Sequence, residues 1–120
     1  MKFVLLLCTL LALAAAETYS PDNDDLDIEA VVGDLNVLKS FIDCFNDKKP
    51  CDEVQADFKK DLPEAFQQSC AKCTAAQKHI FRRFLEVAEE KVPDDLKILK
   101  QKHDPESKYY AALRAAIANA

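Results

Sequence analysis

Cys44-Phe-Asn-Asp-Lys-Lys-Pro-Cys51 and, further along, Cys70-Ala-Lys-Cys73 are the stretches of this sequence that decide its fold. Their four cysteines follow the frame C-x6-C-x18-C-x2-C. An even number of cysteines in a short exported chain is typical of a fold held by disulfides. The sequence therefore predicts two crosslinks, provided that the chain is secreted.

The N-terminus has the layout of a secretory signal peptide. Lys2 precedes the apolar run at residues 3–13, and small residues follow at 14–16. We therefore predict a signal peptide over residues 1–16, which removes the fifth cysteine, Cys8, from the mature chain. The apolar run is too short to span a bilayer, which needs about 20 residues, so we expect no stable membrane insertion.

Composition excludes several classes of function. The full chain of 120 residues has a net charge of −5, and loss of the leader makes it −6, because the leader contains one lysine and no acid. Such an acidic surface argues against nucleic acid as a partner. Gly33 is the single glycine, so a glycine-rich phosphate-binding loop cannot form.

The mature chain is predicted to be one all-α domain. Residues 17–24 are polar and contain Pro21, and we interpret them as a mobile N-terminal arm. From Leu26 onward the apolar residues recur at intervals of three and four, which is the helical period. We therefore expect residues 25–120 to form a compact bundle of six short helices.

Capping residues mark where the first four helices begin and end. The first is predicted from about Asp25 to Val32, with Gly33 as a left-handed C-terminal cap. Side chains of Asp34 and Asp52 are expected to cap the next two, and Thr74 with Gln77 forms a capping box for the fourth.

Three prolines bear on the remaining boundaries. The apolar spacing of the third helix continues past Pro63, which favours a kink there, although two helices meeting at Leu62 remain an alternative. The fourth helix is expected to end before Pro93, and Asp94 to open a fifth. Asp104, followed by Pro105 at the first helical position, is predicted to open a sixth.

Four cysteines allow three connectivities. Chain entropy favours long bridges, at somewhat over 3 kcal/mol against roughly 2 to 2.5 kcal/mol for a short one. Geometry favours a bridge from Cys44 to Cys51, because the break at residues 48–50 lets the chain turn back within the roughly 5.5 Å that a disulfide requires.

Several motifs together resemble insect chemosensory proteins of the olfactory-segment-D type. They are the four-cysteine spacing, Asp-Lys-Lys-Pro-Cys at 47–51, Phe-Lys-Lys-Asp-Leu-Pro-Glu-Ala at 58–65, Cys-Ala-Lys-Cys at 70–73 and Asp-Pro-Glu at 104–106. The resemblance implies pairing of neighbouring cysteines, Cys44 with Cys51 and Cys70 with Cys73. It also implies six helices around an apolar channel that binds long-chain lipids or pheromone-like compounds.

The sequence departs from that family's pattern in three places. The arm lacks a second tyrosine after Tyr19, Lys49 stands where a glycine usually precedes the proline, and no tryptophan occurs near Leu96. A left-handed backbone at Lys49 would be more costly than at glycine.

From helical position and the resemblance together, we predict these channel-lining residues: Leu35, Leu38, Phe41, Ile42, Val54, Phe58, Leu62, Phe66, Ile80, Phe84, Val87 and Leu96.

Other interpretations of single motifs are weaker. Cys70 and Cys73 form a C-x-x-C pair, but a redox site of this kind usually follows a strand, whereas this pair joins two predicted helices. His79 and His103 are too few to bind a metal once the cysteines are paired. The arginines at 82–83 could meet a carboxylate head group, although pairing with Glu86 on the same helix is the more frequent arrangement.

The sequence thus predicts a monomeric, secreted, non-enzymatic carrier without cofactor or metal. It would bind hydrophobic small molecules and carry them through aqueous secretion, with a chemoreceptor as a candidate acceptor. The alternatives are a secreted interaction or developmental protein without a transported ligand, and a thiol oxidoreductase.

Overall fold

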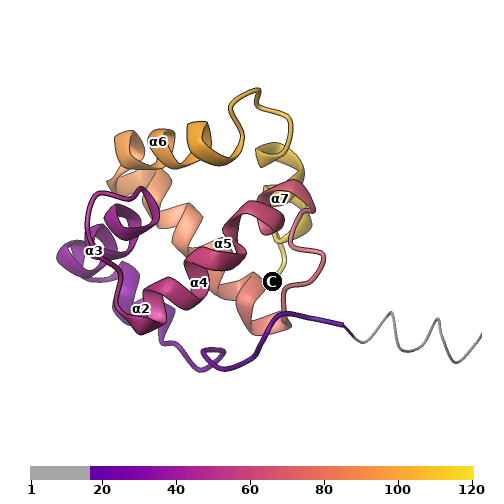
Figure 1. The fold of residues 1–120 in the computed structure, drawn as a ribbon, viewed down its shortest axis with the longest axis horizontal. Helices are drawn as coiled ribbons and strands as arrows, with labels where there is room; N and C mark the ends of the chain where they lie inside the picture. Colours follow the sequence, from indigo (N-terminus) through magenta and orange to yellow (C-terminus); the bar gives the residue numbers. More distant parts are fainter. Residues whose placement is uncertain (1–16) are drawn as a thin grey trace, which may run out of the picture.

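The computed structural model describes residues 17–120, and the predicted signal peptide and Cys8 lie outside the described residues. The described chain contains helices and no strand, which confirms the all-α prediction (Figure 1). The helices are α2 (Ile28–Val32), α3 (Leu35–Phe45), α4 (Glu53–Gln67), α5 (Ala75–Lys91), α6 (Pro93–His103) and α7 (Tyr110–Ala116).

The predicted N-terminal caps of α3, α4 and α5 are confirmed. The side chain of Asp34 accepts hydrogen bonds from the first backbone N–H groups of α3. Asp52 and Thr74 each form a complete capping box, with Gln55 and Gln77 as the returning side chains. These contacts satisfy backbone donors that would otherwise lack partners at a helix start.

The predicted starts of α6 and α7 are wrong. Helix α6 begins at Pro93 and not at Asp94, with Pro93 in the first turn, where its missing N–H is not needed. Helix α7 begins at Tyr110, after a turn that contains Pro105. Asp104 nevertheless caps this region, because its buried carboxylate accepts hydrogen bonds from the backbone N–H groups of residues 108–110.

The cap at the end of α2 also differs from the prediction. The helix ends at Gly33 as predicted. This glycine has φ −78°, a right-handed conformation, so it is not a left-handed cap. A Cβ atom at this position would lie 2.8 Å from the carbonyl oxygen of Glu29. Close approach to the preceding turn therefore explains the glycine.

Helix α4 runs without interruption through Pro63, so the alternative of two helices meeting at Leu62 is excluded.

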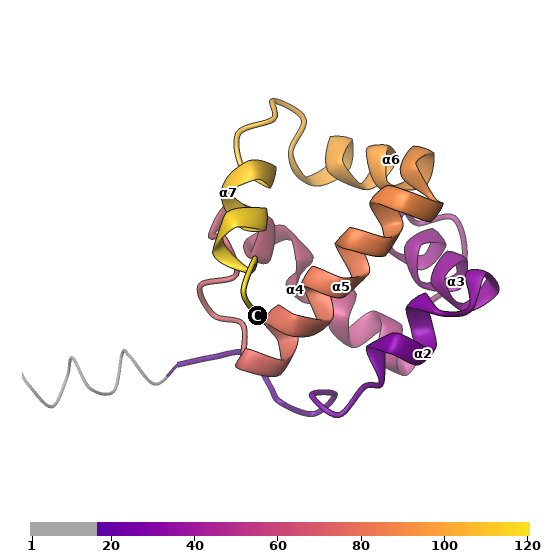
Figure 2. The ribbon, with the colours of Figure 1, turned by 180° about the vertical axis from the view of Figure 1, so that it is seen from behind.

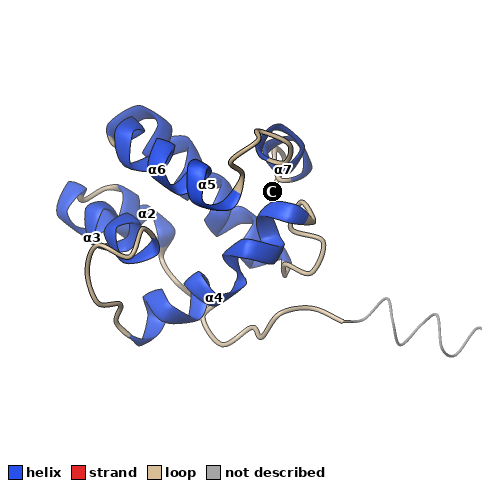
Figure 3. Cartoon of the chain, turned by 45° about the horizontal axis from the view of Figure 1, so that its top comes forward, coloured by secondary structure: helices blue, strands red, loops and turns tan. Residues whose placement is uncertain are grey.

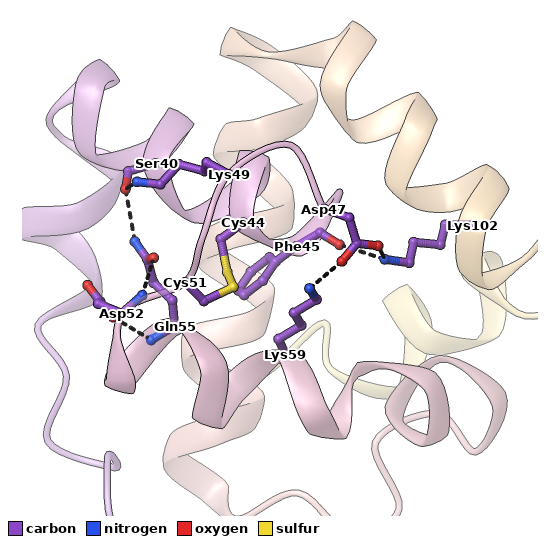
Figure 4. Close-up of a disulfide and its surroundings, with 10 residues drawn as sticks. All are labelled: Ser40, Cys44, Phe45, Asp47, Lys49, Cys51, Asp52, Gln55, Lys59 and Lys102. Carbon is purple, nitrogen blue, oxygen red and sulfur yellow. Dashed lines mark hydrogen bonds and ion pairs between the residues drawn. A yellow bond between two sulfur atoms is a disulfide. The ribbon is translucent and has the colours of Figure 1, made fainter.

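Both disulfides follow the pairing that the resemblance implied. The Cα atoms are 5.1 Å apart for Cys44 and Cys51, and 5.0 Å apart for Cys70 and Cys73. Each crosslink is local, and the first joins the end of α3 to the loop that precedes α4 (Figure 4).

The turn between α3 and α4 avoids the backbone cost expected at Lys49. Its left-handed residue is Asp47, at φ 62°, and Lys49 does not have a positive φ. The carboxylate of Asp47 accepts from the ammonium groups of Lys59 on α4 and Lys102 on α6 (Figure 4). One aspartate therefore ties the turn to two helices.

Helices α2 and α3 pack against each other, α5 packs on α2 and α6, and α4 packs on α3, α6 and α7 (Figures 1 and 2). Helices α4 and α5 are not a closely packed pair. In Figure 3 the molecule is turned so that its top comes forward. This view shows α6 and α5 on one side of the molecule and the first half of α4 on the other.

Candidate ligand-binding cavity

An apolar cavity is lined by residues of α2, α3, α4 and α5 and by Tyr19 of the N-terminal arm. It has a volume of about 60 Å³ and is partly open to solvent. Its walls are almost entirely apolar. The lining residues are Tyr19, Leu26, Ile28, Phe41, Phe45, Phe58, Asp61, Leu62, Ala65, Cys73, Gln77, Ile80, Phe81 and Phe84.

Five of the residues predicted to line a channel lie at this cavity. They are Phe41, Phe58, Leu62, Ile80 and Phe84. Three helices contribute them, α3, α4 and α5, each through the apolar face that its spacing predicted. Their contact with a ligand remains a prediction.

The other seven predicted residues lie elsewhere. Five are buried in the core away from the cavity, and Val54 is partly buried against that core. Leu35 is instead 50% exposed, because it occupies the first turn of α3, beyond the edge of the core. The buried five are Leu38, Ile42, Phe66, Val87 and Leu96.

Sequence reasoning missed two kinds of lining residue. Phe45 and Phe81 belong to the same apolar runs as the predicted residues, so helical spacing contained a signal for them. The polar residues Tyr19, Asp61 and Gln77 carried no such signal, because nothing in the local sequence places them beside an apolar cavity.

The N-terminal arm attaches to α4 through two side-chain hydrogen bonds. The hydroxyl of Tyr19 donates to Glu64 Oε1 at 2.8 Å, and Nδ2 of Asn23 donates to Asp57 Oδ2 at 2.7 Å. Burial raises the pKa of Tyr19, and its hydrogen bond to the Glu64 carboxylate acts in the same direction. Tyr19 therefore remains a neutral donor.

The same arm attaches to the start of α5 and the loop before it. The backbone N–H of Tyr19 donates to the carbonyl oxygen of Lys72 at 2.8 Å. The hydroxyl of Thr74 donates to Asp24 at 3.0 Å, and Nε2 of Gln77 donates to a backbone carbonyl of the arm, also at 3.0 Å. The arm thus bridges α4 and α5, and its Tyr19 forms part of the cavity wall. Figures 1 and 2 show the course of the arm along one edge of the molecule.

The two arginines considered for a head group already have partners. Arg82 forms an ion pair with Glu86 at 3.0 Å, four residues along α5. Arg83 pairs with Glu86 at 2.9 Å and with Glu29 of α2 at 2.7 Å. Neither arginine lines the cavity.

Comparison with known proteins decides the family. The model of the insect pheromone-binding family, A10/OS-D, matches residues 19–111. The chain belongs to this family. The matched residues 19–111 include all four paired cysteines and every residue that lines the cavity.

Curated relatives of this A10/OS-D protein come from insects. Allergen Tha p 1 of Thaumetopoea pityocampa is 34% identical over 112 residues, covering 91% of this chain and 89% of the relative. Ejaculatory bulb-specific protein 3 of Drosophila melanogaster is 30% identical over 117 residues, covering 96% and 93%. A putative odorant-binding protein A10 of the same fly is 27% identical over 93 residues, covering 78% of this chain and 60% of the relative.

A solved structure shows the same fold. It is a chemosensory protein in complex with bromo-dodecanol, with a TM-score of 0.74 and 19% identity, covering 82% of this chain and 98% of that one.

Within residues 17–120 of the A10/OS-D protein, no helix is both long and apolar enough to cross a membrane. The same residues contain no cluster of three potential metal ligands.

Proposed function

We propose that the protein is a secreted carrier that binds a long-chain hydrophobic molecule in the cavity between α4 and α5. The observation that carries the proposal is the cavity itself, which has apolar walls and is lined by residues of α2, α3, α4 and α5. Membership of a pheromone-binding family and the bromo-dodecanol complex of a protein with this fold support the same function.

The energetics favour a flexible apolar chain. Each buried methylene contributes about 0.8 kcal/mol, so ten contribute about 8 kcal/mol, which corresponds to micromolar affinity before ordering costs. The cavity of about 60 Å³ is small beside typical ligand pockets of roughly 300–1,000 Å³. The ligand therefore enlarges the cavity as it enters, by displacing the arm and the half-buried rings of Phe58 and Phe81.

Filling the cavity by mutation tests the proposal. Ala65 of α4 lines the cavity and is 4% exposed, whereas Ala56 of the same helix is exposed to solvent. We expect Ala65→Leu to weaken binding of a fluorescent naphthylamine probe at least tenfold, which is about 1.4 kcal/mol. Ala56→Leu should bind like the wild type, and circular dichroism should show that both variants are folded.

Unchanged probe binding by folded Ala65→Leu would contradict the proposed site. The alternative of a secreted interaction protein without a transported ligand requires a separate measurement. We expect organic extraction of protein purified from its native secretion, followed by mass spectrometry, to yield a long-chain compound. Native protein that is free of such a compound and fails to bind the probe would exclude the carrier function.

A further inference from the structure

The polar groups of the cavity are unevenly distributed between hydrogen-bond donors and acceptors. Only Tyr19, Asp61 and Gln77 among the lining residues carry polar side chains. Nε2 of Gln77 donates to the carbonyl oxygen of Ser20 at 3.0 Å, and its Oε1 accepts from the backbone N–H of Thr74 at 2.9 Å. The hydroxyl proton of Tyr19 is used in the hydrogen bond to Glu64. These bonds use the hydroxyl proton of Tyr19 and one of the two N–H protons of Gln77 Nε2.

Asp61 differs, because its carboxylate accepts no hydrogen bond from any group within residues 17–120. Its nearest cation is the Nζ atom of Lys60 at 3.9 Å, and that lysine is 56% exposed and also pairs with Asp57. The Asp61 side chain itself is 24% exposed, at the boundary between the apolar walls and solvent. An ionised carboxylate can only accept, so a ligand group that meets it must donate.

A carboxylate on the ligand would meet unfavourable charges at the same place. Burial raises the pKa of the Asp61 carboxyl group, and the nearby acids Asp57 and Glu64 add to that effect against the opposing Lys60. A second anion would add to this repulsion. No lysine or arginine lines the cavity, and both Arg82 and Arg83 are bound by glutamates elsewhere.

We propose that Asp61 selects long-chain ligands whose polar end donates a hydrogen bond, an alcohol or a protonated amine, over fatty acids. This inference rests on the proposed function, because it concerns the head group of a molecule whose chain fills the cavity. The free lone pairs of Asp61 accept the hydrogen bond that the ligand donates, and the apolar walls bind the chain. Charge-assisted hydrogen bonds of this kind are roughly twice as strong as neutral ones.

A matched ligand series tests the proposal. Displacement of the naphthylamine probe is measured at pH 8 with dodecanol, dodecylamine, dodecanoate and methyl dodecanoate, which share one chain length. We expect the wild type to bind dodecanol and dodecylamine at least tenfold more tightly than dodecanoate. In Asp61→Asn, which removes the charge at constant size, the preference for dodecylamine over dodecanoate should fall below threefold.

Two further variants separate this effect from net charge and from chain binding. Glu53→Gln removes one negative charge from an exposed position on the same helix, and it should retain the wild-type order of affinities. Asp61→Leu should lose the preference for dodecanol over methyl dodecanoate, because no acceptor remains. Circular dichroism establishes that each variant is folded.

The outcomes distinguish the two proposals. Wild-type affinity for dodecanoate equal to that for dodecanol, or an order of affinities that Asp61→Asn and Asp61→Leu leave unchanged, overturns the role of Asp61 and leaves the carrier function standing. A wild-type protein that binds neither the probe nor methyl dodecanoate overturns the carrier function, and the inference fails with it.

Discussion

His103 is a histidine whose surroundings favour its neutral form. Its ring stacks on Phe66, with 5.1 Å between ring centroids and 27° between ring planes, and its Nε2 atom is buried without a hydrogen-bond partner in the described chain. Burial lowers the pKa of His103, and the ammonium groups of Lys102 and Lys59 also lower it, while Asp47 opposes them. Protonation therefore costs more in the folded protein than in the unfolded chain.

We predict that this histidine makes the protein less stable in mild acid. Because the folded pKa is depressed, the stabilising contribution is complete above the unfolded pKa of about 6.5 and is lost as the pH falls through the folded value. His103 is only partly buried, so the loss between pH 7.5 and 5.5 should stay below about 1 kcal/mol. Urea unfolding at both pH values measures it.

His103→Phe should remove this loss, because the ring stacking on Phe66 is kept and no proton can bind. His79 is exposed and serves as the matched control, so His79→Phe should retain the wild-type dependence on pH. An equal loss of stability in His103→Phe and in the wild type would assign the acid sensitivity to other groups.

At the scale of elements, the N-terminal arm is the part whose movement should control access to the cavity. Tyr19 contributes to the cavity wall and donates to Glu64 at 2.8 Å. A hydrogen bond contributes about 0.5–1.5 kcal/mol net, so Tyr19→Phe should speed probe association roughly two- to thirteenfold. Stopped-flow fluorescence measures the rate.

Tyr109→Phe makes the same chemical change at a hydroxyl that forms no hydrogen bond within the described residues, and it should leave the rate unchanged. Identical association rates for Tyr19→Phe and the wild type would show that the ligand enters without opening the arm. The expected mobility of residues 17–24 would then have no part in binding.

Most helix boundaries could be predicted because their causes are local in sequence. Asp34, Asp52 and Thr74 each cap a backbone N–H two or three residues away. Asp104 instead reaches across a turn to residues 108–110, and the helix that follows begins later than a simple cap predicts. The attachment of the arm was also beyond prediction, because Tyr19 and Glu64 are 45 residues apart.

At the scale of the whole molecule, the sequence predicted which residues face the interior. It did not predict which of them form the packed core and which line the cavity. Leu38, Ile42 and Phe66 have no exposed surface and belong to the packed core, whereas Phe41 and Leu62 on the same two helices line the cavity. Helical spacing cannot separate these sets, because both lie on inward-facing stripes. The difference depends on how the helices pack against one another, which the spacing within a single helix does not specify.

The small volume of the cavity leads to a prediction about chain length. Its volume of about 60 Å³ equals only a few water-sized spheres of roughly 10–15 Å³ each, so a short alcohol can enter without rearrangement. Each further methylene could raise affinity about fourfold, from about 0.8 kcal/mol of burial. Beyond the available space, displacement of the arm and of Phe58 must offset part of this gain.

We therefore expect probe displacement by hexanol, octanol, decanol, dodecanol and tetradecanol to show increments that fall below fourfold per methylene as the chain lengthens. Tyr19→Phe should bring the increments of the longer alcohols closer to fourfold, because a less firmly attached arm costs less to displace, while hexanol should bind both proteins alike. A constant fourfold increment through tetradecanol in the wild type would mean that the interior accommodates the long chain without any such opening.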